Sequence, residues 1–162
     1  MFRSHEGNIP SVNAQFYSNT STYSYYGYNA RMFASLAPYR RMILETESET
    51  KGWPLLRPPV MYHTDDPQSR ATSYQSFYLG PNLYVAPVLD PETFTVDVYL
   101  PGQEWTYTHV WTGTRYNGGS TITASTPYGK PAVFIVNDAE VPELQQFLEF
   151  VKQENATEIS VN

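Results

Sequence analysis

Polar side chains that could bind a ligand or transfer a proton are concentrated near the start of the chain, in residues 2–8, which read FRSHEGN. An apolar residue followed by Arg3, His5 and Glu6, and ended by Gly7, is typical of a strand that ends in a polar pocket. Imidazole and carboxylate groups in such a pocket can hydrogen-bond hydroxyl groups or act as acids and bases. The alternative interpretation is a frayed N-terminus in which these polar residues occur by chance.

Carboxylates form the second group of candidates, because hydrolysis of a glycosidic bond needs two of them, one as acid and one as base or nucleophile. Asp65 and Asp66 precede a proline, which most simply predicts a turn in which their side chains bond nearby amides. Asp90 and Asp97 flank predicted strands, where exposed acids are the normal case. The full set of candidates is Glu6, Asp65, Asp66, Asp90, Asp97 and Glu104.

A metal or nucleotide site is not expected. His5, His63 and His109 are tens of residues apart, so they do not form a metal-ligand spacing. The sequence contains neither a glycine-rich dinucleotide motif nor a phosphate-binding loop, and the Ser-centred motif of hydrolases does not occur. Zero cysteines exclude disulfides and thiolate zinc sites and weakly favour an intracellular location. We therefore predict no metal and no cofactor.

The elements that must position these residues differ between the two halves of the chain. Residues 29–50 carry apolar side chains at three- and four-residue spacings, which predicts a helix. Asn29 is the expected N-cap, Pro38 should kink the helix, and Gly52 should end it.

Two other segments of the first half lack this helical period. Residues 16–28, rich in Ser, Thr, Asn and Tyr, predict an ordered loop. Residues 54–62 are apolar but interrupted by prolines, so they can pair only as a short or edge strand.

The second half predicts a small antiparallel sandwich and a closing helix. Short runs rich in Val, Thr, Tyr and Trp alternate with turn residues. The Asn117–Gly119 segment is expected to form a hairpin turn. Asp138 is the expected cap of the closing helix, Pro142 lies in its first turn, and the residues after Gln153 should fray. The expected strands cover 83–89, 93–100, 104–111, 120–124 and 132–136.

Composition and charge exclude several classes of partner. The 162-residue chain has a net charge of −6 and a sequence pI near 4.9. It contains no basic cluster, so it should not attract nucleic acid or anionic lipid. No apolar run is long enough to cross a bilayer, and the first residues lack the apolar stretch of a secretory signal. Residues 1–80 are almost neutral, whereas residues 81–162 carry nearly all the negative charge.

Five motifs, in this order and spacing, resemble the C-terminal portion of glycoside hydrolase family 31. This family contains α-glucosidases, α-xylosidases and sulfoquinovosidases, and the motifs look most similar to the sulfoquinovosidase branch. The resemblance runs from about residue 1 to 138. The motifs are FRSHEGN at 2–8, LAPYR at 36–40, GWPLLRP at 52–58, YLGPNLYVAPV at 78–88 and VYLP at 98–101.

The resemblance implies a fold that combines an α/β part with an all-β part. Family members have an N-terminal β-sandwich, a (β/α)8 barrel and one or two C-terminal β domains. The last strands and helices of the barrel would be followed by a small antiparallel β-sandwich and a C-terminal helix. The expected division is the barrel end in 1–80, the β-sandwich in 81–139, the helix in 140–153 and a tail in 154–162.

The resemblance also implies roles for two residues. His5 matches a histidine of the family that binds hydroxyls of the sugar in the cleavage subsite. Arg3 fits a neighbouring arginine that orients the pocket by ion pairing. Both catalytic aspartates of this retaining mechanism lie upstream in the family, so we expect no catalytic residue in this chain.

Binding groups without a nucleophile and an acid cannot supply the roughly ten or more kcal/mol that an enzyme needs. The chain alone is therefore expected to be an inactive portion of an α-glucosidase or sulfoquinovosidase, with the preceding barrel portion as its partner. The residues that would bind a sulfonate group also lie upstream of this motif in the family.

Two other functions remain open. Trp105, Tyr107, Trp111 and Tyr116 could stack on sugars in a non-catalytic carbohydrate-binding β module, although such alternating aromatics more often fill a core. A purely structural β domain is the third interpretation.

Overall fold

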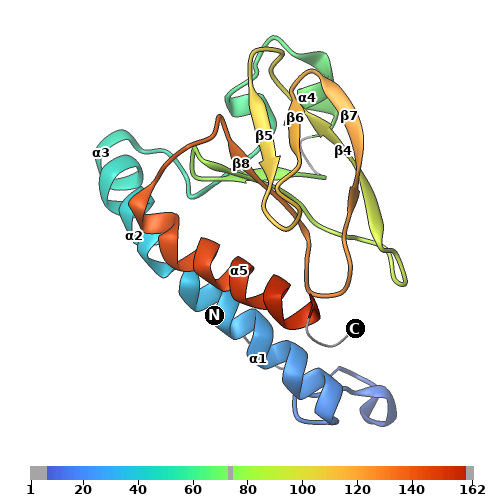
Figure 1. The fold of residues 1–162 in the computed structure, drawn as a ribbon. Helices are drawn as coiled ribbons and strands as arrows, with labels where there is room; N and C mark the ends of the chain where they lie inside the picture. Colours follow the sequence, from blue (N-terminus) through green and yellow to red (C-terminus); the bar gives the residue numbers. More distant parts are fainter. Residues whose placement is uncertain (1–6, 73–74, 160–162) are drawn as a thin grey trace.

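The computed structural model of this protein describes residues 7–72 and 75–159, and these form three layers (Figure 1). Helices cover one face of a six-stranded antiparallel sheet, and a two-stranded sheet covers the other. The helices are α1 (Thr20–Ser35), α2 (Ala37–Ile43), α3 (Glu49–Lys51), α4 (Pro67–Ala71) and α5 (Gln145–Ile159). The strands are β1 (Leu56–Arg57), β2 (Phe77–Leu79), β3 (Leu83–Ala86), β4 (Thr95–Leu100), β5 (Thr106–His109), β6 (Arg115–Asn117), β7 (Ser120–Ser125) and β8 (Ala132–Val136).

The first helix begins earlier than its apolar pattern predicts. Asn19 caps α1 by accepting a hydrogen bond from the Thr22 amide at 2.9 Å, and Thr22 Oγ1 accepts one from the Asn19 amide. The predicted loop over residues 16–28 is therefore wrong from Thr20 onward, and so is the predicted cap at Asn29, which lies inside α1. The capping box starts the helix at Thr20, although the polar, tyrosine-rich residues that follow have only weak apolar periodicity.

The predicted interruption near Pro38 and the predicted stop at Gly52 are both confirmed. Leu36 separates α1 from α2, and Pro38 lies in the first turn of α2. A π-helical turn (Leu44–Ser48) follows, and Gly52 ends α3 in the left-handed conformation with φ of 72°. Glycine adopts this conformation without the steric cost that a Cβ would bring.

The six-stranded sheet has the order β1-β2-β3-β8-β5-β6, and β4 pairs with β7 in the second sheet. The expected short edge strand in residues 54–62 is confirmed as β1. The β2–β3 hairpin spans residue 80, so strands before and after the expected domain boundary belong to one sheet. The division itself stays a prediction, as does the assignment of residues 1–80 to a barrel.

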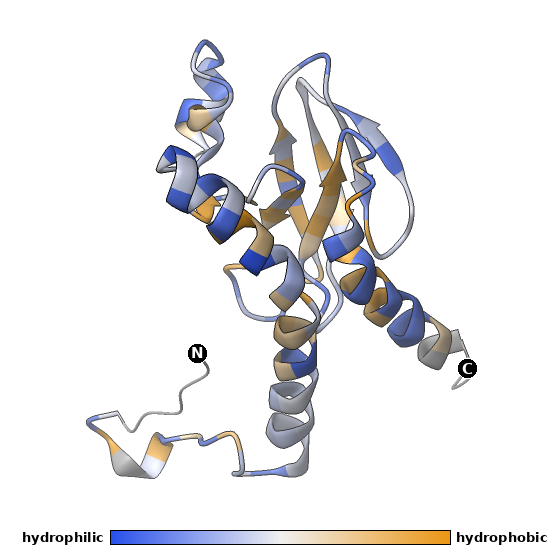
Figure 2. Cartoon of the chain, turned by 90° about the vertical axis from the view of Figure 1, so that its left-hand side faces the viewer, coloured by the Kyte–Doolittle hydropathy of each residue, from blue (hydrophilic) through white to orange (hydrophobic). Residues whose placement is uncertain are grey.

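Alternating residues of β3 and β8 form the two cores. Tyr84, Ala86 and Phe134 point toward β4 and β7, while Leu83 and Val133 face α2 and α5. The central strands are consequently apolar on both sides, as Figure 2 shows by their hydrophobic colouring. The antiparallel β architecture with a C-terminal helix is thus confirmed.

Three local predictions in the second half need correction. The Asn117–Gly119 turn has the expected positive φ at Gly119 (77°), but it carries the chain from one sheet to the other instead of forming a hairpin. Asp138 does not cap the closing helix, because its carboxylate pairs with Arg115 at 2.5 Å and accepts a bond from Thr108. Helix α5 also continues past Gln153 to Ile159.

Helix α5 packs beside α1 (Figure 1), with the Tyr28 and Phe150 rings 5.3 Å apart. Asn155 donates a hydrogen bond to the Trp111 carbonyl at 2.8 Å, which holds the last turns of the helix against the segment after β5. None of the helices in the described residues combines the length and apolarity that crossing a membrane requires.

Candidate functional site

The residues with the strongest implied role, Arg3 and His5, lie outside the described residues together with Glu6. The described chain starts at Gly7, whose amide donates to Asn13 Oδ1 at 2.8 Å. The 3-10 turn at Pro10–Val12 brings Asn13 back to this position. Gly7, near the end of the candidate sugar-binding motif, is therefore held by a local side-chain contact.

Asp66 has the structural role that the sequence predicts for the Asp65–Pro67 turn. It caps α4 by accepting from the Gln68 amide at 3.0 Å and from Ser69 Oγ at 2.8 Å. Tyr99 donates a further bond to the same carboxylate at 2.8 Å. Burial opposes ionisation, but these bonds outweigh it and hold the pKa of Asp66 below its usual value. Asp66 is therefore a stable anion and unsuited to act as a general acid.

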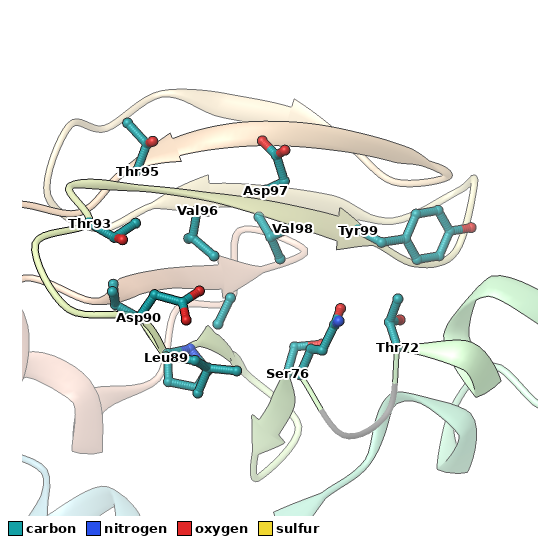
Figure 3. Close-up of a pocket in the computed structure, with 14 residues that line it drawn as sticks. Thr72, Ser76, Leu89, Asp90, Thr93, Thr95, Val96, Asp97, Val98 and Tyr99 are labelled. Carbon is teal, nitrogen blue, oxygen red and sulfur yellow. The ribbon is translucent and has the colours of Figure 1, made fainter.

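Asp90 and Asp97 both line a pocket of about 240 Å³ between β4 and the segment after β3. Figure 3 shows Val96 and Val98 on the same side of β4 as Asp90, whereas Asp97 points to the opposite side. Asp97 there accepts a hydrogen bond from Thr123 on β7 at 2.6 Å. Because strand alternation separates the two carboxylates, they do not form an acid and nucleophile pair around one bond.

A buried arginine of the GWPLLRP motif forms a second polar cluster. Arg57 is 1% exposed, and its guanidinium pairs with Glu47 and hydrogen-bonds Tyr62 Oη. Its Nε donates to the Pro54 carbonyl at 2.8 Å, and its plane packs against the ring of Trp53. The π-helical turn brings Glu47 to this position, so the arginine joins the end of the helical segment to β1.

A chain of hydrogen bonds links a half-buried histidine to the interior. Tyr107 donates to the Pro101 carbonyl at 2.7 Å, so its hydroxyl oxygen accepts from Tyr78, also at 2.7 Å. The Tyr78 proton is then used, and its oxygen accepts from His63 Nε2 at 2.9 Å. The direction of these bonds places a proton on Nε2 and leaves Nδ1 as the acceptor of the neutral ring.

His63 lines a hollow of about 420 Å³ with Asp65, Tyr99 and Gln103. Burial lowers its pKa, and the nearby Asp66 carboxylate only partly opposes this shift. The imidazole is therefore neutral near pH 7 and suited to hydroxyl binding. Burial raises the pKa of Tyr78 far above its usual value, so this tyrosine transmits hydrogen bonds without ionising.

The aromatic residues of the alternative carbohydrate-binding interpretation are largely internal. Tyr107 is fully buried, and Trp111 is buried with its Nε1 donating to the Pro131 carbonyl at 2.8 Å. Trp105 packs edge-on against His63, with ring centroids 4.5 Å apart. Trp105 and Tyr116 are partly buried against the same core, so these rings serve mainly in packing.

The part of the chain that the structure describes contains no group of three His, Cys, Asp or Glu side chains that could hold a metal ion. Glu104 is exposed in the turn before β5. The described candidates thus include anchoring carboxylates and hydroxyl-binding groups, but not a convergent pair for acid and nucleophile.

Comparison with known proteins identifies the family. The model of the "Glycosyl hydrolase family 31 C-terminal domain" matches residues 52–139, more than half of the chain. The chain belongs to glycosyl hydrolase family 31. The sulfoquinovosidases of Escherichia coli and Agrobacterium fabrum are 34% and 36% identical to it, each over 86% of its length. The predicted membership of family 31, with sulfoquinovosidases among its relatives, is confirmed.

Solved structures of family 31 enzymes have the same fold. A sulfoquinovosidase from E. rectale, solved with an aza-sugar inhibitor, superposes with a TM-score of 0.76 and 29% identity over 94% of this chain and 21% of its own. An α-xylosidase from a soil metagenome gives 0.69 and 25% over 84% of this chain and 19% of its own. The chain spans about a fifth of the length of the curated sulfoquinovosidases that it matches.

Only part of this arrangement has a signal in the sequence. The Asp-Asp-Pro turn is readable from local chemistry. The Arg57–Glu47 pair spans ten residues across an irregular π-turn, and the His63–Tyr78–Tyr107 chain joins three strands or loops. The abundance of tyrosine, 14 residues, is the one compositional hint of a hydroxyl network.

Proposed function

We propose that this chain is the C-terminal region of a retaining α-glycosidase that acts on sulfoquinovosides or α-glucosides. The observation that carries this proposal is the similarity to two sulfoquinovosidases over 86% of the chain, together with the family match in residues 52–139. In this role, residues 1–80 complete the catalytic barrel, residues 81–139 form the adjoining β domain, and α5 is the helix that closes it.

His5 binds hydroxyl groups of the sugar in the cleavage subsite, and Arg3 orients the pocket by ion pairing. A neutral imidazole suits this task because it both donates and accepts a hydrogen bond. The contact of Asn13 with the Gly7 amide supports this proposal, because it holds the C-terminal end of the motif in place.

The chain by itself is inactive in this proposal. Asp66 is committed to a helix cap, and Asp90 and Asp97 lie on opposite sides of β4. Without a nucleophile and an acid, the remaining binding groups leave most of the catalytic barrier in place.

A chimera tests the proposal. The matching C-terminal fifth of the Escherichia coli sulfoquinovosidase is replaced by this chain, and hydrolysis of a nitrophenyl sulfoquinovoside and a nitrophenyl α-glucoside is measured. We expect the chimera to hydrolyse one of these substrates and the chain alone to hydrolyse neither.

His5→Ala in the folded chimera should lower kcat/KM by about tenfold to a hundredfold, since it removes hydrogen bonds to the sugar worth roughly 1.5–3 kcal/mol. Asp65→Asn, at an exposed carboxylate beside the helix cap, is the control and should leave kcat/KM unchanged. A folded chimera without activity, or one indifferent to His5→Ala, would contradict the proposal.

A further inference from the structure

Exposed aromatic side chains gather where the segment after β3 meets the β7–β8 turn. Phe94 is 49% exposed and Tyr128 is 63% exposed, and their ring centroids lie 5.1 Å apart with an interplanar angle of 87°. The Tyr25 ring of α1 lies 6.2 Å from Tyr128 on another side. Contiguous exposed apolar side chains often mark an interaction surface or a ligand-binding groove, so this corner is a candidate ligand site.

A hollow of about 480 Å³ lies beside Tyr128 and is lined largely by apolar groups of rigid residues. Four prolines line this hollow: Pro87, Pro91, Pro127 and Pro131. The Thr126 amide donates to the Phe94 carbonyl at 2.7 Å, which ties the two loops together. The walls are therefore preformed, and a ligand would lose little free energy to ordering them.

The polar groups of the hollow are mainly acceptors. Asp90 and Glu92 both line it, and Thr93 Oγ1 there donates to the Pro91 carbonyl at 3.2 Å. Lys130 also lines it, but its Nζ donates to Asn155 at 3.0 Å and lies over the Trp111 ring, and the residue is 6% exposed. The accessible charge is thus negative, and it suits a ligand that offers hydroxyl donors and carries no negative charge.

We propose that this hollow, together with the Tyr128 and Phe94 rings, is a second, non-catalytic binding site for neutral oligosaccharides. The C–H face of a pyranose packs on the Tyr128 ring, and its hydroxyls donate to Asp90 and Glu92. Tyr128 also lines a smaller hollow with Tyr25 and Arg31, and a chain of more than one sugar would extend from one hollow to the other. The site is independent of the proposed function, because it uses neither Arg3 nor His5.

The test is titration of the full chain with maltotriose and isomaltotriose, followed by calorimetry and saturation-transfer NMR. We expect millimolar binding of at least one trisaccharide, weakened about tenfold by Tyr128→Ala, equivalent to about 1.4 kcal/mol. The double variant Asp90→Asn, Glu92→Gln should also weaken binding, while Tyr23→Ala, at a tyrosine 62% exposed elsewhere on α1, should leave it unchanged.

Two further titrations distinguish this site from the pocket that would contain His5. Trisaccharide binding that is lost in His5→Ala but kept in Tyr128→Ala would assign the sugar to that pocket and overturn the proposal. A sulfoquinovoside should bind more weakly than the trisaccharide that binds best, and equal affinity would overturn the assignment of a neutral ligand. The proposal also fails if neither trisaccharide binds, or if Tyr128→Ala leaves the affinity unchanged while changing only the self-association of the chain.

Discussion

His109 is a buried histidine whose protonation the fold does not accommodate. It is 2% exposed, its Nδ1 lies 3.0 Å from Thr112 Oγ1, and its Nε2 has no hydrogen-bond partner within the residues that the structure describes. Burial lowers its pKa below the ordinary value near 6.5. Below that pH the unfolded chain binds more protons than the folded chain, so the free energy of unfolding falls as the pH drops.

We expect His109→Phe to reduce this pH dependence, because the variant has no proton to bind at this position. The measurement is the free energy of unfolding in urea at pH 8 and at pH 5, for both proteins. The variant should lose less stability between the two values, and part of the loss remains because the pKa of His63 is also lowered. Equal losses in the two proteins would show that His109 does not titrate as its burial requires.

The buried ion pair gives a second prediction at the scale of single residues. Glu47→Gln leaves the guanidinium of Arg57 buried without its counter-charge, which should cost about 2–3 kcal/mol of unfolding free energy. Glu49→Gln is the matched control, because Glu49 is an exposed glutamate two positions along the same segment and should change stability by less than about 0.5 kcal/mol. Urea denaturation at pH 7 measures both, and equal effects would contradict a specific role for the Arg57–Glu47 pair.

At this scale, contacts between residues close in the sequence can be predicted, whereas contacts between residues far apart in the sequence cannot. Asp66 bonds a nearby amide as its Asp-Asp-Pro context predicts, because its partners Gln68 and Ser69 lie within three residues, although the short helix that it caps was not predicted. The bond from Tyr99 to the same carboxylate crosses 33 residues and depends on how β4 packs against α4. No local pattern could have predicted it.

Turns between elements are set by close approach of backbones, and Gly118 is the clearest case. A Cβ at this position would lie 2.0 Å from the Gly102 carbonyl oxygen and 2.6 Å from that of Pro101. Gly118→Ala should therefore cost about 3 kcal/mol or more, since backbone atoms cannot move aside as a flexible side chain does.

Gly113→Ala provides the comparison for this prediction. Gly113 has a φ of 70°, but a Cβ built there would meet no atom within 4 Å. Its alanine variant should therefore lose only the roughly 1–2 kcal/mol of unfolding free energy that the left-handed conformation costs a non-glycine residue. Thermal unfolding of both variants distinguishes steric overlap from backbone strain. A Gly118→Ala protein as stable as the Gly113→Ala protein would contradict the close packing of the Gly102 and Gly118 turns.

The ends of helices and strands were predictable where a residue with a special backbone, such as glycine or proline, sets them. They were not predictable where tertiary packing sets them. Gly52 and Pro38 act through the backbone, so the helix stop and the interruption near Leu36 follow from the sequence. Strands β2 and β6 are three residues long and were missed, because they form by pairing with longer neighbours and not by their own periodicity.

At the scale of the whole molecule, the all-β half was predictable because each of its main strands has its own alternation and its own turns. The helical face of the six-stranded sheet was harder, since α2 and α5 are separated by about a hundred residues in the chain yet share one core with Leu83 and Val133. This long-range packing and the β2–β3 hairpin across residue 80 join the two halves of the described chain into one layered structure.

The segment before α1 exposes apolar side chains that no other described element covers. Val12 is 74% exposed, Tyr17 is 67% exposed and Ile9 is 61% exposed. We expect the isolated chain to self-associate through this segment, because apolar surface of this kind gains free energy when it is removed from water. Sedimentation velocity from micromolar to submillimolar concentration should show a rising average mass, and the double variant Val12→Ser, Tyr17→Ser should suppress that rise.

Leu89→Ser is the matched control for self-association, because Leu89 is equally exposed, at 69%, but lies in the segment after β3. It should leave the mass profile unchanged, since Leu89 lies outside residues 9–17. If Leu89→Ser suppresses association as strongly as the double variant, the contact is made by the β domain instead. Association through residues 9–17 would place the surface that needs a partner next to the FRSHEGN motif, where the proposed barrel portion would cover it.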